Sequence, residues 1–185
     1  MEISHGHLTV RPLSEEDATL LQKWLSDPKV LQYYGGRDAP YDLPMVYERI
    51  LAKVGNPVWG CLVLWDSLPV GYLQTYRLTA KEISDYGYVQ SSIVIYGMDQ
   101  FLGETTMWNQ GIGTTLVSVV SKWLLTQYGA DYVVMDPRAD NQRAIHVYEK
   151  CGFTKVRRLS SWEWHEGRHH DCWLMELPSR SHGGP

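Results

Sequence analysis

Trp108-Asn109-Gln110-Gly111-Ile112-Gly113-Thr114 is the stretch that decides the fold, because it joins a strand pattern to a helix pattern. Ser92–Leu102 before it has the pattern of a central strand, and Gly111–Gln127 has one apolar face at helical spacing. Gly111 and Gly113 carry no Cβ, so the backbone can turn sharply and an anion can approach its N–H groups. A helix start adds unpaired donors and a partial positive charge, which suit a phosphate or pyrophosphate.

Downstream of this helix the sequence predicts a strand, a second helix and a hairpin. Tyr132–Met135 is short and fully apolar, so we expect it inside the sheet. Asn141–Lys150 has a helical pattern that ends before a glycine. Phe153–Glu163 and His170–Leu177 are expected to pair as a closing hairpin around Glu166-Gly167.

The upstream half predicts further strands and helices of the same domain. We expect a strand at His7–Leu13, followed by helices at Ser14–Ser26 and Asp42–Lys53. Two strands joined as a hairpin, Val58–Trp65 and Val70–Leu78, and a loop, Lys81–Gln90, are expected next. We expect one domain over residues 1–177. The tail, 178–185, has nothing to bury and is expected to be mobile.

Composition narrows the class of protein. A net charge of −4 argues against nucleic acid as a partner and is compatible with a cationic substrate. The three cysteines are widely spaced and odd in number, which favours reduced thiols in the cytoplasm. No apolar run approaches the ~18–20 residues of a membrane span. The chain has 8 Trp and 12 Tyr but only 2 Phe. This excess of Trp and Tyr is compatible with a cleft for a polar, ring-shaped ligand, and equally with large side chains that pack on a mixed sheet.

His165-Glu166-Gly167-Arg168-His169 has the letters of a zinc-protease motif. That chemistry needs both histidines on one face of a continuous helix. Here a glycine interrupts the motif and strand-like sequence flanks it. We therefore predict a hairpin turn and no metal site.

Nearly the whole chain, from about Leu8 to Leu177, resembles the aminoglycoside 6′-N-acetyltransferases of the GNAT superfamily. It is most similar to the acetyltransferase half of the bifunctional acetyltransferase–phosphotransferase resistance enzyme. The segments that carry the resemblance are Tyr34–Asp38, Tyr96–Phe101, Gly111–Thr114, Asp136-Pro137, Asn141, Arg143–Ile145, Tyr148, Gly152-Phe153, His165–Gly167, Asp171-Cys172 and Met175-Glu176. The resemblance implies an α/β (α+β) GNAT fold, with a mixed central sheet of about seven strands and helices on both faces.

The resemblance also implies the reaction. The acetyl group of acetyl-CoA would pass directly, in a ternary complex, to the 6′-amine of an aminoglycoside antibiotic, giving resistance in the cytoplasm. The enzyme would need no metal and would be a monomer or a homodimer. The residues implied to bind acetyl-CoA are Phe101, Gln110, Gly111, Ile112, Gly113, Thr114, Asn141 and Ala144.

The implied catalytic residues are Asp99 and Tyr148. An alkyl ammonium has a pKa of ~10, so a carboxylate that binds the cation and helps remove its proton suits the chemistry. Asp99 takes this role, although from its letter alone it could be a capping or ion-paired carboxylate at a strand end. Tyr148 would protonate the departing thiolate, or would be a helix tyrosine packed on the core. Acceptor binding is assigned to Tyr34, Asp85, Asp99, Asp136 and Asp171.

Two other functions are compatible with the sequence. A GNAT enzyme could acetylate a polyamine or a protein N-terminus. From a different class, the chain could be a CoA-binding regulator without catalysis, although the retained Asp99 argues against that.

Overall fold

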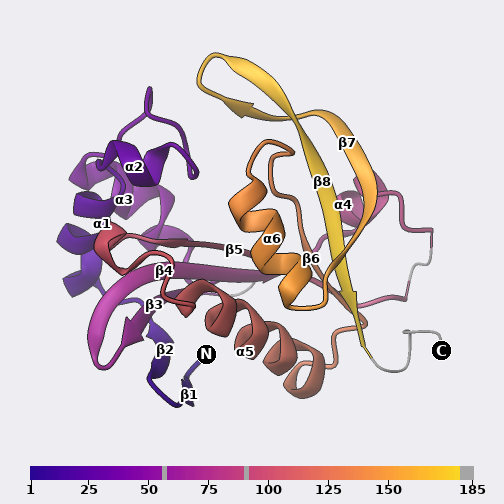
Figure 1. Ribbon diagram of the computed structural model, residues 1–185, viewed down its shortest axis with the longest axis horizontal. Helices are drawn as coiled ribbons and strands as arrows, with labels where there is room; N and C mark the ends of the chain where they lie inside the picture. The colour runs from indigo at the N-terminus through magenta and orange to yellow at the C-terminus, as the bar shows by residue number, and fades with distance from the viewer. Residues whose placement is uncertain (56–57, 90–91, 180–185) are drawn as a thin grey trace. The chain divides into compact units, whose positions relative to one another are not determined.

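A computed structural model describes residues 1–55, 58–89 and 92–179 (Figure 1). The described strands are β1 (Ile3–His5), β2 (Leu8–Pro12), β3 (Val58–Trp65), β4 (Leu68–Arg77), β5 (Ile95–Leu102), β6 (Tyr132–Met135), β7 (Thr154–His165) and β8 (Arg168–Pro178). The described helices are α1 (Ala18–Trp24), α2 (Pro28–Leu31), α3 (Leu43–Arg49), α4 (Ala80–Asp85), α5 (Ile112–Gln127) and α6 (Gln142–Lys150). Short 3-10 turns lie at Glu15–Asp17, Leu51–Lys53 and Thr105–Met107.

The strands form one mixed sheet in the order β1-β2-β3-β4-β5-β6-β8-β7. β1 pairs antiparallel with β2, and β2 with β3. β5 and β6 run parallel, with Tyr96 opposite Val133, and β6 pairs antiparallel with β8. The expected α/β class and mixed sheet are therefore confirmed. The described strands number eight rather than about seven, because β1 has only three residues and the sequence pattern did not reveal it.

The chain divides into two compact units, and β4 and β5 contribute residues to both. Unit 1 comprises Met1–Thr75, Asp99–Gly113 and Trp164–Arg168. Unit 2 comprises Tyr76–Met98, Thr114–Glu163 and His169–Pro185.

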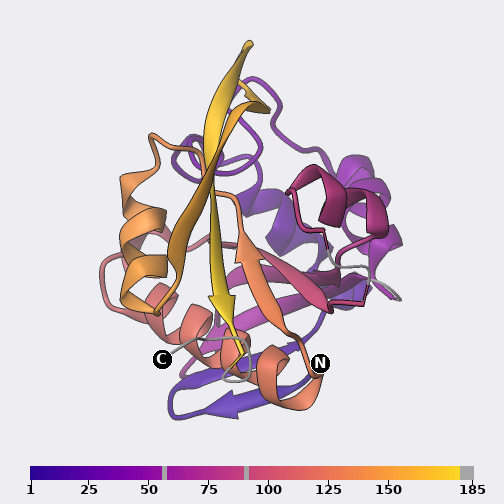
Figure 2. The ribbon, with the colours of Figure 1, turned by 90° about the vertical axis from the view of Figure 1, so that its right-hand side faces the viewer.

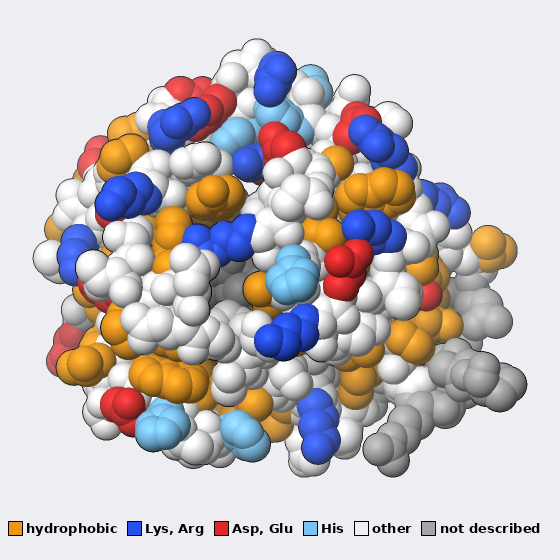
Figure 3. All heavy atoms as spheres, viewed as in Figure 1, with side chains coloured by type: hydrophobic (Ala, Val, Ile, Leu, Met, Phe, Trp, Pro, Cys, Tyr) orange, Lys and Arg blue, Asp and Glu red, His pale blue; other side chains and the backbone are white. Residues whose placement is uncertain are grey.

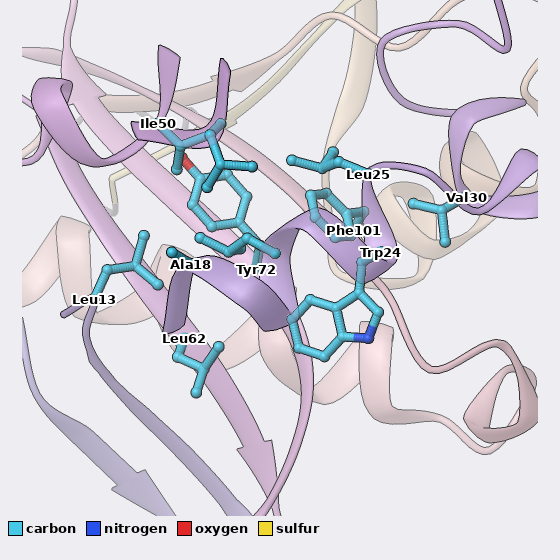
Figure 4. Packing of buried hydrophobic residues seen from close by; sticks show 11 residues of the cluster. Leu13, Ala18, Trp24, Leu25, Val30, Ile50, Leu62, Tyr72 and Phe101 are labelled. Atoms are coloured by element: carbon cyan, nitrogen blue, oxygen red, sulfur yellow. The ribbon is translucent and has the colours of Figure 1, made fainter. Parts of the chain in front are cut away.

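The core of unit 1 forms where α1 and α3 cover strands β3 and β4. Figure 4 shows the rings of Trp24, Tyr72 and Phe101 among the aliphatic side chains of this cluster. Helix α3 begins where Asp42 accepts a hydrogen bond from the backbone N of Met45 at 2.9 Å. This cap satisfies one of the unpaired donors of the helix start, so the predicted start of the second helix is confirmed.

The core of unit 2 forms around the first half of β5, β6 and the two last strands. Its buried residues are Leu78, Ile93, Ile95, Val134, Leu159, Cys172 and Leu174. Figure 2 shows the β7–β8 hairpin as a long twisted ribbon. Its turn falls at Glu166-Gly167, as predicted, so His165–His169 spans a hairpin turn. No group of side chains suited to a metal ion occurs among the described residues.

Two expectations about local structure were wrong or only partly right, and one short helix was not predicted. The predicted loop Lys81–Gln90 contains all but the first residue of helix α4, and Gln90 lies outside the described residues. The missed signal was the capping box in which Thr79 and Glu82 bond each other's backbone N–H. Helix α2 was also missed, although Asp27 caps it and Pro28 opens it. Pro178 lies in β8 rather than in a tail, and 180–185 lie outside the described residues.

Candidate active site

Asp99 lies on β5, in unit 1, with its carboxylate fixed by a directional chain of hydrogen bonds. Tyr72 OH donates to Gln74 Oε1 at 2.8 Å, and Gln74 Nε2 donates to Asp99 Oδ2 at 2.7 Å. Tyr72 and Gln74 are two residues apart on β4, so their side chains leave the same face of the sheet. A carboxylate only accepts, so the amide N of Gln74 must face Asp99. This hydrogen bond therefore orients the carboxylate.

An aromatic cluster borders this carboxylate. The ring of Tyr34 lies 4.8 Å from that of Phe101 and 6.5 Å from that of Tyr72, centroid to centroid. Burial, followed by the fields of Tyr72 and Asp99, raises the pKa of Tyr34 well above its ordinary value. Tyr34 is thus a neutral hydroxyl within the electrostatic reach of Asp99. Phe101 is buried in the core of unit 1 at 8% exposure, so any contribution of it to a cofactor would come from its backbone.

The glycine turn before α5 distinguishes its two glycines. Gly111 has a φ of +83°, a conformation that other residues adopt only with strain. Gly113 has no such requirement, and a Cβ added to it would meet nothing within 4 Å. Neither the backbone conformation nor side-chain packing therefore requires a glycine at position 113. The close approach of a ligand to the backbone would require one. Ile112 is buried, so its contribution to a ligand would be its backbone N–H.

The rest of this turn is braced from within. Trp108 Nε1 donates to the carbonyl O of Leu102 at 2.9 Å, and Gln110 Nε2 donates to the carbonyl O of Thr106 at 3.1 Å. The Trp108 ring also meets Tyr33 edge-on at 6.0 Å. These side chains therefore fix the course of the loop that carries the glycines.

Helix α6 and its N-cap, in unit 2, carry three of the predicted residues, Asn141, Ala144 and Tyr148. Asn141 Oδ1 accepts from the backbone N of Ala144 at 3.1 Å, which makes Asn141 the N-cap of the helix. Tyr148 is 9% exposed, and its ring packs against that of Phe153 at 6.1 Å. The cap fixes the start of α6, and both alternatives for Asn141, cap and ligand contact, remain compatible with its geometry.

Asp136, at the end of β6 in unit 2, is held by neutral donors. Its Oδ2 accepts from Tyr86 OH at 2.9 Å and from Trp162 Nε1 at 2.8 Å. The two donor rings lie 5.5 Å apart. Within 1–55, 58–89 and 92–179, no Lys or Arg forms an ion pair with Asp136, so its negative charge is oriented but not neutralised by a side chain.

The other two predicted carboxylates already have cationic partners. Asp85 lies 2.6 Å from Lys81 Nζ in an exposed pair. Asp171 accepts from the backbone N of Ser161 and from Arg158 Nε, each at 2.9 Å, and these bonds lower its pKa. Their charge is therefore less available to a ligand than that of Asp136.

Sequence reasoning missed several residues around these carboxylates. Gln74 and Tyr72 could have been suspected from their period-2 spacing on a strand beside β5. Glu163 could not have been found from the sequence, because its environment depends on the register of the β7–β8 hairpin. Burial and the nearby Asp136 raise the pKa of Glu163, and its Oε1 accepts from Arg138 at 3.3 Å.

The family model described as Acetyltransferase (GNAT) domain matches residues 14–161, so the chain belongs to the GNAT acetyltransferases. Aminoglycoside N(6′)-acetyltransferase type 1 of Klebsiella pneumoniae is 29% identical over 160 residues, which are 82% of this chain and 76% of that protein. The aminoglycoside acetyltransferase AAC(6′)-Ib in complex with coenzyme A is 25% identical, with a TM-score of 0.72 over 95% of this chain and 96% of that one.

A more distant structure extends the comparison. Spermidine N-acetyltransferase from Vibrio cholerae, with CoA and spermine, has a TM-score of 0.74 over 96% of this chain and 99% of that one. Its identity of 16% shows the shared fold alone. The finer likeness to one half of the bifunctional enzyme stays a prediction. No helix in the described part of the chain is long and apolar enough to cross a membrane.

Proposed function

We propose that this enzyme transfers the acetyl group of acetyl-CoA to the 6′-amine of aminoglycosides and so confers resistance. The observation that carries the proposal is the Asp99 carboxylate on β5, which Gln74 orients through a 2.7 Å hydrogen bond. The similarity to the Klebsiella pneumoniae acetyltransferase over 82% of the chain supports the choice of acceptor.

The chemistry requires a free amine. At a pKa of ~10, about one alkyl amine in a thousand is deprotonated at pH 7. Asp99 would bind the ammonium and orient its nitrogen toward the thioester. Because an Asp of pKa ~3.9 is a weak base, we propose that Asp99 mainly orients the amine and that a bound water relays its proton to the solvent. The free amine then attacks the thioester carbonyl carbon, the nitrogen loses its second proton by the same relay, and the C–S bond breaks to give the amide and the CoA thiolate. Tyr148 is the proposed proton donor to the departing thiolate.

Acetyl-CoA would be held by backbone and small residues. The N–H groups of Gln110–Thr114 would bind the pyrophosphate, with Gly113 leaving room for its close approach. The backbone of Phe101, the Nδ2 of Asn141 and the start of α6 at Ala144 would contact the pantetheine arm. Acetyl-CoA supplies the activated acyl group, and no metal is required for this transfer.

An aminoglycoside carries several ammonium groups, so further carboxylates are expected to bind it. Asp136 is the best candidate among these, because the two groups that donate hydrogen bonds to its carboxylate are neutral and leave its charge available to a cation. Asp85 and Asp171 are weaker, since each has a cationic partner. We expect the enzyme to act in the cytoplasm as a monomer or a homodimer, with no nucleic acid or membrane partner.

The test measures CoA release and product mass with kanamycin, amikacin, spermidine and an N-terminal peptide as acceptors. We expect turnover with kanamycin that falls by about 10²–10⁴-fold in Asp99→Ala and Asp99→Asn. Asp66→Asn is the control, because it alters an exposed carboxylate at a turn whose φ of +50° suits Asn. Activity with spermidine or peptide alone would refute the proposed acceptor, and activity with none would favour a CoA-binding regulator.

A further inference from the structure

The turn between β7 and β8 is tied to the loop that carries Tyr34. Glu166 Oε1 accepts from the backbone N of Arg37 at 3.0 Å and from its Nε at 2.6 Å. Glu166 Oε2 accepts from Arg37 Nη2 at 2.6 Å. A forked guanidinium–carboxylate pair with an added backbone bond fixes direction as well as distance. Both residues belong to unit 1.

The backbone at Glu166 indicates that its side chain is required. Glu166 and Gly167 have φ values of +48° and +80°, as in a hairpin turn that favours Asn or Asp before Gly. Glu is uncommon in this left-handed conformation, and Asn would satisfy the backbone with less strain. The longer carboxylate therefore has a function that the turn alone does not demand, and the bonds to Arg37 supply one.

The turn also packs against the loop. His165 is 4% exposed, and a Cβ added to Gly36 would lie 3.6 Å from His165 Nδ1 and 3.6 Å from Glu166 Cγ. Gly36 has a φ of +108°, a backbone conformation that only glycine adopts readily, and the loop bends there. Figure 3 shows acidic, basic and histidine side chains gathered over the end of the hairpin.

The course of this loop depends on a few contacts. Helix α2 ends at Leu31 and α3 begins at Leu43, with no helix or strand between them. Near one end, the Tyr34 ring lies on Phe101. Three residues later, Arg37 lies on Glu166. The two contacts together hold the bend at Gly35-Gly36.

We propose that the Arg37–Glu166 ion pair is a latch that holds the Tyr34 loop in place for the acceptor amine. The two residues are positioning residues and touch neither reactant. This inference rests on the proposed function, in which Tyr34 borders the amine site at Asp99. It predicts that the latch sets the affinity for the acceptor and leaves acetyl-CoA binding and the chemical step unchanged.

The kinetic test compares Arg37→Gln, Glu166→Gln and the double variant with the wild type. We expect the KM for kanamycin to rise about two- to fivefold in each single variant, and no further in the double variant, because either change breaks the same pair. The kcat and the KM for acetyl-CoA should not change. Glu149→Gln is the matched control, since it breaks the similarly exposed Lys155–Glu149 pair of 2.8 Å and should leave every constant at the wild-type value.

Hydrogen exchange of peptides that cover residues 32–42 tests the latch without any acceptor. Faster exchange in both single variants, with a raised acceptor KM, would support the proposal. Exchange at the wild-type rate would overturn it, and so would faster exchange with an unchanged acceptor KM. If the wild-type enzyme acetylates no aminoglycoside, the proposed function fails, and the exchange comparison still decides whether the ion pair orders the loop.

Discussion

Gln74 Nε2 donates a 2.7 Å hydrogen bond to Asp99 Oδ2, and this bond connects a strand position to the proposed chemistry. The amide is itself oriented by Tyr72, whose hydroxyl occupies the Gln74 oxygen at 2.8 Å. Tyr72 is almost fully buried in the core of unit 1, so the orientation of the carboxylate is set by core packing. In the proposed function, this orientation would let Asp99 bind the substrate ammonium with little reorganisation.

Removing this bond should weaken the reaction. Gln74→Leu is expected to lower kcat/KM for kanamycin by about 10–100-fold, because an unoriented carboxylate misplaces the amine. Tyr72→Phe should lower it less, since the amide keeps its bond to Asp99 but loses the group that orients it. The control is Thr75→Val on the same strand, whose hydroxyl has no hydrogen-bond partner in the described part of the chain. Steady-state constants equal to the wild type in Gln74→Leu would contradict the role.

Gly113 offers a test of the phosphate site that stability does not confound. A Cβ there meets open space, and Ala is the better helix former, so Gly113→Ala should unfold at the same or a higher temperature. We nevertheless expect its KM for acetyl-CoA to rise about tenfold, because the methyl group would hold the pyrophosphate away from the backbone N–H groups. Gly111→Ala should instead lower the unfolding temperature, since a φ of +83° strains alanine. An unchanged KM for acetyl-CoA in Gly113→Ala would remove the pyrophosphate from this turn.

Substitution of Asp136 and of Asp171 should change the KM for kanamycin by different amounts, although both residues are carboxylates of unit 2. Asp136→Asn removes a charge that no described Lys or Arg neutralises, so the KM for kanamycin should rise about tenfold. Asp171→Asn removes a charge already paired with Arg158 and should change this KM by less. Acceptor kinetics of the two variants, measured with acetyl-CoA saturating, decide the point. Equal effects would contradict the stronger role proposed for Asp136.

The sequence was most informative where a local rule has one physical cause. The Gly-x-Gly turn, the hairpin at Glu166-Gly167 and the start of α3 follow from backbone freedom and capping, and they could be predicted. Helix α4 was missed because its signal was a capping box without an apolar stripe. The partners of Asp136 could not be predicted, since Tyr86 and Trp162 are far from it in the sequence and only the tertiary fold brings them together.

Asp17 provides the clearest prediction about stability and pH. Its carboxylate accepts from Arg11 Nη1 and Nη2 at 2.8 and 2.7 Å and from the backbone N of Ser14 at 2.9 Å. Burial alone would raise the pKa of Asp17, but these bonds together outweigh it, and the pKa in the folded state is lowered. The unfolded carboxyl has a pKa of ~3.9, so the stabilisation is complete above that pH and is lost as the pH falls through the folded pKa.

Asp17→Asn should therefore lower the free energy of unfolding at pH 7 by about 1.5–3 kcal/mol, the range for hydrogen bonds to a charged group. Its unfolding temperature should also fall less than that of the wild type between pH 5 and pH 2, because the titrating group is gone. Thermal unfolding of both proteins across this range measures the difference, with Asp66→Asn as an exposed control. Parallel pH curves for Asp17→Asn and the wild type would show that the Arg11–Asp17 pair contributes nothing to acid sensitivity.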